Sequence, residues 1–242
     1  MPYNLITNYP ITNQHNQNAI KKSTIIRFLF HPRVIHQMTS SHQMNTSRIS
    51  NNIREELQLS SHTLLLGTVG NFVPGRDQLS ICRFLEKLND TKIDFHFLFI
   101  GKRDKKMPQL YDNCVNYCQQ NNLLDKVSFL GSRNDVPDLL SQLDAFVYST
   151  DHDTFGIAVV EAMAVGLPVF VNDWGVMKEI TDNGKLATLY KTKDESDLLQ
   201  QFMLFLQNKE TYKTKVLEAS RFVREKYSIE KHIQNLKEVY SR

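Results

Sequence analysis

Residues 149–168 read STDHDTFGIAVVEAMAVGLP, and this stretch decides the fold that we expect. A polar loop passes through a Phe-Gly step into an apolar helix that carries a single acid, Glu161. Gly166 can adopt the left-handed conformation that ends many helices, and Pro168 prevents the helix from continuing. The stretch therefore predicts a loop and a short closed helix, the pattern that follows a strand in an α/β sheet.

Two acids of this stretch, Asp153 and Glu161, have seven residues between them. An acid on an otherwise apolar helix is costly to bury without a partner. Ahead of the helix, Thr154, Phe155 and Gly156 are expected to present free backbone N–H groups, which suit a phosphate. Two interpretations stay open here. The stretch is either a ligand site or an ordinary turn in which one acid caps the helix and the other ties down a neighbouring loop.

The composition is that of a globular protein, with 41% hydrophobic and 23% charged residues and a formal net charge of +3 over 242 residues. Apolar runs are too short to span a bilayer, and no signal-peptide pattern opens the chain, so we expect a cytoplasmic protein. Cys82, Cys114 and Cys118 have no partner at metal-ligand spacing, which predicts reduced thiols and no metal site.

The composition changes near residue 60. Residues 1–60 contain no glycine and carry six Lys or Arg against two Glu, whereas all nine glycines lie between Gly67 and Gly184. Since glycines form the tight turns of nucleotide-binding sheets, we expect a polar N-terminal extension or linker over 1–60 and a nucleotide-binding domain over 61–242. The scattered basic surplus predicts at most a peripheral membrane contact and no nucleic-acid partner.

From residue 64 onward strand and helix patterns alternate, which predicts a Rossmann-like parallel sheet with helices on both faces, followed by C-terminal helices. The expected strands are 64–69, 95–100, 127–130, 145–148, 169–171 and 187–190. The expected helices are 79–88, 108–121, 136–141, the helix of the opening stretch, 198–206, 212–226 and one that starts at Ser228. In the first segment we expect a strand or helix over 23–30, a strand over 33–36 and a helix over 48–57 capped by Ser47.

Ligands bind outside the carboxyl ends of the strands in an open α/β sheet. Gly70, Gly101 and Gly131 follow three expected strands, and the loop at Asp153–Gly156 follows a fourth. The same edge of the sheet is therefore expected to collect all four, and this convergence favours a nucleotide site.

The opening stretch resembles the signature of retaining glycosyltransferases with the GT-B fold: two acids around a Phe-Gly step, then a small-residue helix that ends Gly-Leu-Pro. The resemblance runs from about residue 64 to the C-terminus and implies the half of a GT-B fold that binds a nucleoside diphosphate sugar, of UDP or GDP type, without a metal. It implies that Glu161 binds the ribose hydroxyls and that Asp153 holds hydroxyls of the donor sugar. Backbone amides near the diphosphate or sugar would come from Phe155, Gly156 and Ile157.

Four residues depart from the family pattern. The family places an Arg and, five residues later, a Lys on the diphosphate, and Asn71 and Arg76 occupy these positions here. The next Gly has become Asp77, and the first acid is Asp153 where the family usually has Glu. Arg76 can still bind phosphate with two parallel hydrogen bonds, but losing its companion cation weakens the argument for catalysis.

Other cations and one histidine lie near the expected site. Lys102 and Arg103 either supply the missing positive charge or are simply exposed. Arg133 matches a loop that lies against the base in relatives, where its backbone would read the base edge. His152, beside the acids, is either a general base or a bystander.

The resemblance implies transfer of a hexose-type sugar, with retention, to an unknown glycan, polysaccharide or lipid-linked acceptor, carried by Asp153, Glu161 and Arg76. About 60 residues precede the nucleotide domain, too few for an acceptor domain of usual size. We therefore expect a donor half that needs an acceptor-domain protein in trans, or a piece of a longer protein. Two alternatives stay open: a nucleotide-sugar-binding module without transfer, and a degenerate remnant in which Glu161 is only structural.

Overall fold

A computed structural model describes residues 52–241, and the structural statements below concern that range. The elements expected over 23–30 and 33–36, and the cap expected at Ser47, lie outside the described residues. Helix α3 (Ile53–Glu56) is the first described element, and Asn52 caps it by accepting a hydrogen bond from the backbone N–H of Arg54. This helix therefore starts later than the expected range of 48–57.

Six strands form one parallel sheet in the order β3-β2-β1-β4-β5-β6, which confirms the expected Rossmann-like sheet. The chain runs outward from β1 to β3 and then returns to place β4 on the other side of β1. The topological switch point, where ligands bind in such sheets, therefore lies between β1 and β4. The strands are β1 (Leu64–Val69), β2 (Phe95–Ile100), β3 (Val127–Gly131), β4 (Ala145–Tyr148), β5 (Val169–Asn172) and β6 (Thr188–Tyr190).

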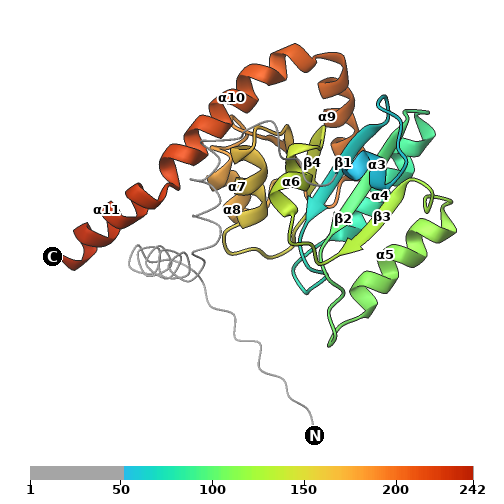
Figure 1. Cartoon of the computed structure of the whole chain (residues 1–242), viewed down its shortest axis with the longest axis horizontal. Helices are drawn as coiled ribbons and strands as arrows, with labels where there is room; N and C mark the ends of the chain where they lie inside the picture. Colours follow the sequence, from blue (N-terminus) through green and yellow to red (C-terminus); the bar gives the residue numbers. More distant parts are fainter. Residues whose placement is uncertain (1–51, 242) are drawn as a thin grey trace, which may run out of the picture.

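Helices cover both faces of the sheet (Figure 1). One face carries α4 (Gln78–Asp90), α5 (Gln109–Gln120) and α9 (Glu195–Gln207). The other face carries α3, α6 (Val136–Ser141), α7 (Ile157–Ala164), α8 (Gly175–Ile180) and α10 (Lys209–Lys226). Helix α11 (Ile229–Tyr240) continues past the end of α10, away from the sheet (Figure 1).

Burial follows the alternation of side chains along each strand. Leu65 and Phe146 belong to the core under α7, whereas Leu66 and Val147 belong to the core under α4, and all four are fully buried. Period-two burial on two faces is what a strand between two helical layers requires. The three cysteines are free thiols buried between α4 and α5.

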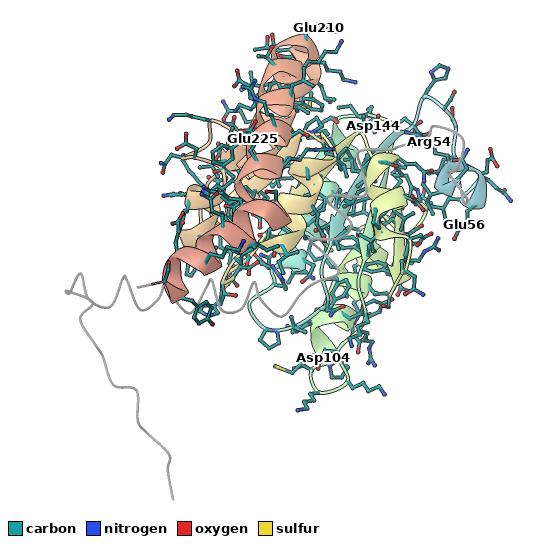
Figure 2. The ribbon with its side chains drawn as sticks, turned by 60° about the vertical axis from the view of Figure 1, so that its left-hand side comes forward. Arg54, Glu56, Asp104, Asp144, Glu210 and Glu225 are labelled. Carbon is teal, nitrogen blue, oxygen red and sulfur yellow. The ribbon has the colours of Figure 1, made fainter. Side chains whose placement is uncertain are left out.

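Helix α3 packs on the same core, although it precedes the domain boundary expected at residue 60. Ile53 is fully buried, and Arg54 donates to Asp144 at 2.9 Å, at the start of β4 (Figure 2). Residues on both sides of the expected boundary thus share one core, and the division into 1–60 and 61–242 stays a prediction.

Helix α10 closes the C-terminal end of α7. Ser220 Oγ donates to the carbonyl oxygen of Ala164 at 2.8 Å, and Arg224 donates to the same oxygen from Nε at 2.9 Å and from Nη2 at 2.7 Å. A carbonyl in the last turn of a helix has no partner within the helix. These bonds therefore fasten the helix that carries Glu161.

Replacing Arg224 by alanine is expected to lower the free energy of unfolding by about 1.5–3 kcal/mol, because the Ala164 carbonyl loses a charged donor. Equilibrium unfolding in urea, followed by circular dichroism, measures the loss. Arg221→Ala, at an exposed position of the same helix, is the matched control. Equal losses in the two variants would contradict the role assigned to Arg224.

Candidate functional site

Two loops meet at the switch point: the β1–α4 loop (residues 70–77) and the β4–α7 loop (residues 149–156). The carbonyl oxygen of Gly75 accepts hydrogen bonds from the backbone N–H groups of Asp151 and His152, at 3.0 and 3.1 Å. Gly75 has a φ of +89°, and a Cβ added there would lie 2.7 Å from the His152 carbonyl oxygen. Only glycine fits this contact, so the two loops are held together by backbone geometry.

Arg76 and Asp153 form an ion pair across these loops. Arg76 Nη1 donates to Asp153 Oδ2, and the hydroxyl of Tyr148, the last residue of β4, donates to the same oxygen at 2.5 Å. The guanidinium carbon of Arg76 lies 4.9 Å from the Tyr148 ring centroid. Burial lowers the pKa of Arg76, and the Asp153 carboxylate acts in the opposite direction.

The other carboxylate oxygen of Asp153 caps its own loop. Oδ1 accepts a hydrogen bond from the backbone N–H of Phe155 at 3.2 Å. Our expectation of a free amide at Phe155 was therefore wrong, because the shorter aspartate folds back onto it. Gly156 (φ +78°) precedes α7 without a side-chain cap, and Thr154 is exposed.

Asp77, which replaces a family glycine, has its own partners. Lys193, in the loop between β6 and α9, lies 2.8 Å from Asp77 Oδ2 and 2.9 Å from Asp151 Oδ1. Asp77 also accepts a hydrogen bond from the backbone N–H of Ser80 at the start of α4. Asp77 and Asp153, the two acids that differ from the family pattern, are thus each paired with a cation. Nothing in the local sequence links Lys193 to Asp77, and reasoning from the sequence missed it.

Asn172, at the carboxyl end of β5, positions the β4–α7 loop and was also missed. Its side chain is fully buried; Oδ1 accepts from the Thr150 N–H at 3.0 Å, and Nδ2 donates to the Thr150 carbonyl at 2.8 Å. Nδ2 also donates to Thr192 Oγ1 at 3.0 Å. One buried amide therefore anchors the loop that holds Asp153.

Asn172→Ala is expected to lower the free energy of unfolding by about 2–4 kcal/mol, because it leaves buried backbone groups of Thr150 unpaired. Thermal and urea unfolding measure the change. Asn134→Ala, at an exposed loop position, is the control that should stay within about 0.5 kcal/mol of wild type. A stable Asn172→Ala protein would contradict the anchoring role.

Glu161 lies in the middle of α7, between the buried residues Val160 and Ala162. Glu161 is half-buried, and its carboxylate has no hydrogen-bonding or ionic partner among the described residues. Burial raises the pKa of Glu161 to about 7. The alternative that Glu161 ties down a neighbouring loop therefore finds no contact in its support. Ile157, at the start of this helix, is half-buried.

The loops after β1 and β2 touch closely. A Cβ added at Gly101 would lie 2.0 Å from the carbonyl oxygen of Gly70, so a larger residue cannot occupy this position. Gln78 donates to the carbonyl oxygens of Gly70 and Asn71 at 3.3 and 3.1 Å. The Asn71 side chain accepts from the N–H of Lys102 at 3.0 Å. The structure thus brings together Gly70, Asn71 and Gly101, as expected from the sheet topology.

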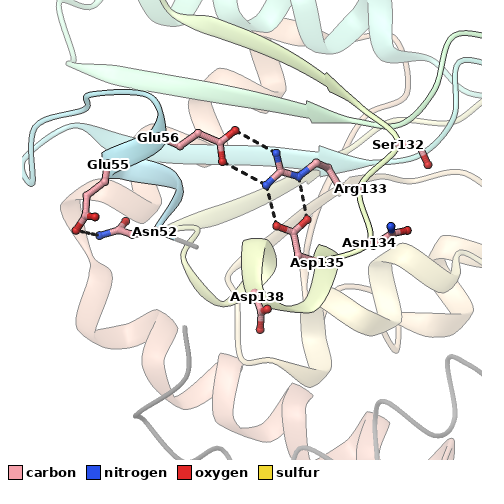
Figure 3. Close-up of a pocket in the computed structure, with 8 residues that line it drawn as sticks. All are labelled: Asn52, Glu55, Glu56, Ser132, Arg133, Asn134, Asp135 and Asp138. Atoms are coloured by element: carbon pink, nitrogen blue, oxygen red, sulfur yellow. Dashed lines mark hydrogen bonds and ion pairs between the residues drawn. The ribbon is translucent and has the colours of Figure 1, made fainter. Parts of the chain in front are cut away.

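Arg103 and Arg133 are both held by carboxylates. Arg103 forms two hydrogen bonds with Asp112, at 2.8 and 2.6 Å, on the exposed surface, and Lys102 is exposed; a role of either as the missing cation stays a prediction. Arg133 binds Asp135 at 2.9 and 2.7 Å and Glu56 at 3.1 and 3.3 Å (Figure 3). These carboxylates raise the pKa of Arg133.

The Arg133 side chain lines an open pocket of about 820 Å³ between α3 and the loop after β3 (Figure 3). The pocket is lined by Asn52, Glu55, Glu56, Ser132, Arg133, Asn134, Asp135 and Asp138. Four carboxylates against one guanidinium give it an acidic lining, which disfavours an anion such as a diphosphate. A role for the Arg133 backbone at the base edge stays a prediction.

Residues 49–221 match the model of the family "Glycosyl transferases group 1", so the chain belongs to this family. It is 22% identical over 188 residues to the N-acetyl-alpha-D-glucosaminyl L-malate synthase of Bacillus anthracis, covering 78% of this chain and 48% of that protein. It is 29% identical over 125 residues to a Campylobacter jejuni N,N'-diacetylbacillosaminyl-diphospho-undecaprenol alpha-1,3-N-acetylgalactosaminyltransferase, covering 52% of this chain and 31% of that one. The chain thus spans about half, or less, of these relatives.

Among solved structures, the chain resembles Anabaena HepE in complex with UDP and glucose, with a TM-score of 0.72 and 19% identity over 78% of this chain and 51% of that one. At this identity the likeness concerns the fold, which is that of one domain of a GT-B glycosyltransferase. Within the described range no three His, Cys, Asp or Glu side chains gather as a metal site requires, and metal independence stays a prediction. None of the described helices has the length and apolarity to cross a bilayer.

Proposed function

We propose that this domain binds the nucleotide part of a nucleoside diphosphate sugar at the switch point between β1 and β4. The observation that carries the proposal is the carboxylate of Glu161, which is half-buried, has no partner among the described residues and stands on the helix that follows the loop of Asp153. A carboxylate in that condition is suited to accept two neighbouring hydroxyl donors, and a ribose offers such a pair.

Arg76 supplies the positive charge for the diphosphate in this proposal. It is the only Lys or Arg in the β1–α4 and β4–α7 loops, and its side chain is 23% exposed. The N-terminal end of α7, with Gly156 and Ile157, adds backbone N–H groups and the positive end of the helix dipole. Developing charge on the leaving diphosphate would be stabilised by these groups without a metal.

The proposed activity of the whole protein is transfer of a hexose-type sugar, with retention, to a glycan, polysaccharide or lipid-linked acceptor. Because the chain spans about half of its relatives, the acceptor domain would come from a second polypeptide or from the rest of a longer protein. The UDP in the Anabaena HepE complex supports uracil as the first base to test. His152 is exposed, and no contact of its ring among the described residues supports a catalytic role.

A binding module without transfer is the second candidate. Asn71 stands where the family has a cation, and Asp153 is engaged by Arg76 and Tyr148, and both features reduce the charge available for catalysis. Release of UDP from UDP-glucose, measured with and without an added acceptor-domain protein, separates the two. An enzyme should release UDP when the acceptor half is present, and a binding module should not.

Isothermal titration with UDP, GDP, ADP and CMP tests the donor-site proposal. We expect one nucleotide to bind and the other bases to bind more weakly. A well-folded chain that binds none of the four would contradict the proposal and favour the degenerate remnant.

A further inference from the structure

Asp153 and Arg76 form an ion pair that the family resemblance does not imply. Both oxygens of Asp153 have donors: Oδ2 receives Arg76 and the Tyr148 hydroxyl, and Oδ1 receives the Phe155 N–H. The side chain of Asp153 is 9% exposed. A carboxylate with all of these donors in place has little room for the hydroxyls of a sugar.

We propose that Asp153 is a specificity-determining residue that competes with the ligand's phosphate for Arg76, and that Tyr148 is the positioning residue that holds Asp153 in place. This inference rests on the proposed nucleotide site. A guanidinium neutralised by a neighbouring carboxylate attracts an added phosphate less than a lone guanidinium does, and the two anions repel each other. The phosphates should therefore contribute little to the affinity of the wild-type protein.

Asp153 is held in place more firmly than Arg76 is. Tyr148 is 2% exposed, and the Tyr190 hydroxyl donates to its carbonyl oxygen at 2.9 Å, so the tyrosine is fixed from both sides. Asp153 keeps the Tyr148 hydroxyl and the Phe155 N–H even when Arg76 leaves. Arg76 stands on a flexible stem and is partly exposed. A phosphate would therefore move Arg76 and leave Asp153 where it is.

This exchange links recognition of the diphosphate to recognition of the sugar. Once a phosphate takes Arg76, Oδ2 of Asp153 loses its cation and can accept a hydroxyl of the sugar. Coupling of this kind is reciprocal, so a sugar on Asp153 also favours phosphate on Arg76. Free glucose should therefore bind only when a nucleoside diphosphate is present.

Within the described range, two cations near the β1–α4 loop are already engaged by carboxylates, and a third, Lys102, is exposed beside Asn71. Lys193 is paired with Asp77 and Asp151, and Arg103 is paired with Asp112. Asn71, at the position of the missing companion, carries no charge. Within the β1–α4 and β4–α7 loops, phosphate binding therefore depends on how far Asp153 neutralises Arg76.

The test compares the affinities of the chain for uridine and UDP, or for guanosine and GDP if guanine is the preferred base. The dissociation constant of the nucleoside divided by that of the nucleoside diphosphate is the phosphate gain, which is the factor by which the phosphates tighten binding. Asp153→Asn removes the competing charge and is expected to raise the gain about tenfold. Tyr148→Phe leaves the carboxylate less firmly held and should raise the gain about threefold, and Arg76→Gln should reduce the gain to near one.

Asp151→Asn is the matched control, because it removes the same charge from the same loop but leaves the Arg76–Asp153 pair intact. The inference would be overturned if the phosphate gain of Asp153→Asn equals that of Asp151→Asn or falls below that of the wild-type protein. In that case, binding of nucleotide by the wild-type protein would still support the nucleotide site. A wild-type protein that binds none of uridine, UDP, guanosine and GDP would contradict both the nucleotide site and the inference about Asp153. If Asp153→Asn does not fold, Tyr148→Phe decides alone: an unchanged gain overturns the inference.

Discussion

Glu161→Ala is expected to weaken nucleotide binding by about thirtyfold or more, because two hydrogen bonds from a ribose to a charged acceptor are lost together. Isothermal titration with the preferred nucleoside diphosphate measures the loss. The fold should survive, since the variant removes an acid that has no partner among the described residues. Glu225→Ala, on the exposed surface of α10 (Figure 2), is the control and should bind as wild type does. Equal affinities in the two variants would place the nucleotide elsewhere.

The second large effect is a dependence of nucleoside affinity on pH. Burial raises the pKa of Glu161 to about 7, and donation from ribose hydroxyls favours the ionised form. Binding should therefore strengthen as Glu161 ionises, by about tenfold between pH 6 and pH 8. Uridine is the suitable probe, because it carries no phosphate that titrates in this range. Glu161→Gln should bind with a flat pH profile, and a wild-type profile that matches it would contradict the role of Glu161.

Ionisation of Glu161, which should strengthen nucleoside binding, should also lower the stability of the folded protein. A carboxyl whose pKa is raised by folding holds its proton more tightly in the folded state, so its contribution is fully present below the ordinary pKa of 4.5. That contribution is lost as the pH rises through about 7. Relative to Glu161→Gln, the wild-type protein should therefore lose stability over this window. Urea unfolding at pH 5 and pH 8 measures the difference.

The sequence was sufficient to predict most of the fold, because each strand between residues 64 and 148 is a short, mainly apolar run that ends at Gly or Ser. Helix α8 was missed. It has six residues, begins at Gly175 and follows the exposed Trp174, so it offers too few turns for a helical period to be recognised.

The position of the site could be predicted from the sequence, but the ion pairs between its side chains could not. Gly70, Gly101 and the loop of Asp153 meet at one edge because parallel strands deliver their carboxyl ends together. The contact of Arg76 with Asp153 joins residues 77 positions apart, and that of Lys193 with Asp77 joins residues 116 apart. Such contacts depend on side-chain directions, which spacing along the chain does not encode.

Aspartate at position 153 illustrates the difference. From the sequence, the missing methylene could only weaken a sugar contact. In the structure the shorter side chain turns back onto Phe155 and meets Arg76 and Tyr148. The two acids that depart from the family pattern, Asp77 and Asp153, thus have cationic partners within the site.

A crystal structure of the chain soaked with UDP, or with GDP if guanine is preferred, tests the central claim most directly. We predict that the nucleotide lies at the carboxyl ends of β1 and β4, with both ribose hydroxyls within hydrogen-bonding distance of the Glu161 carboxylate and a phosphate on Arg76. A nucleotide found instead in the acidic pocket beside Arg133 (Figure 3), or one whose ribose does not reach Glu161, would contradict the account.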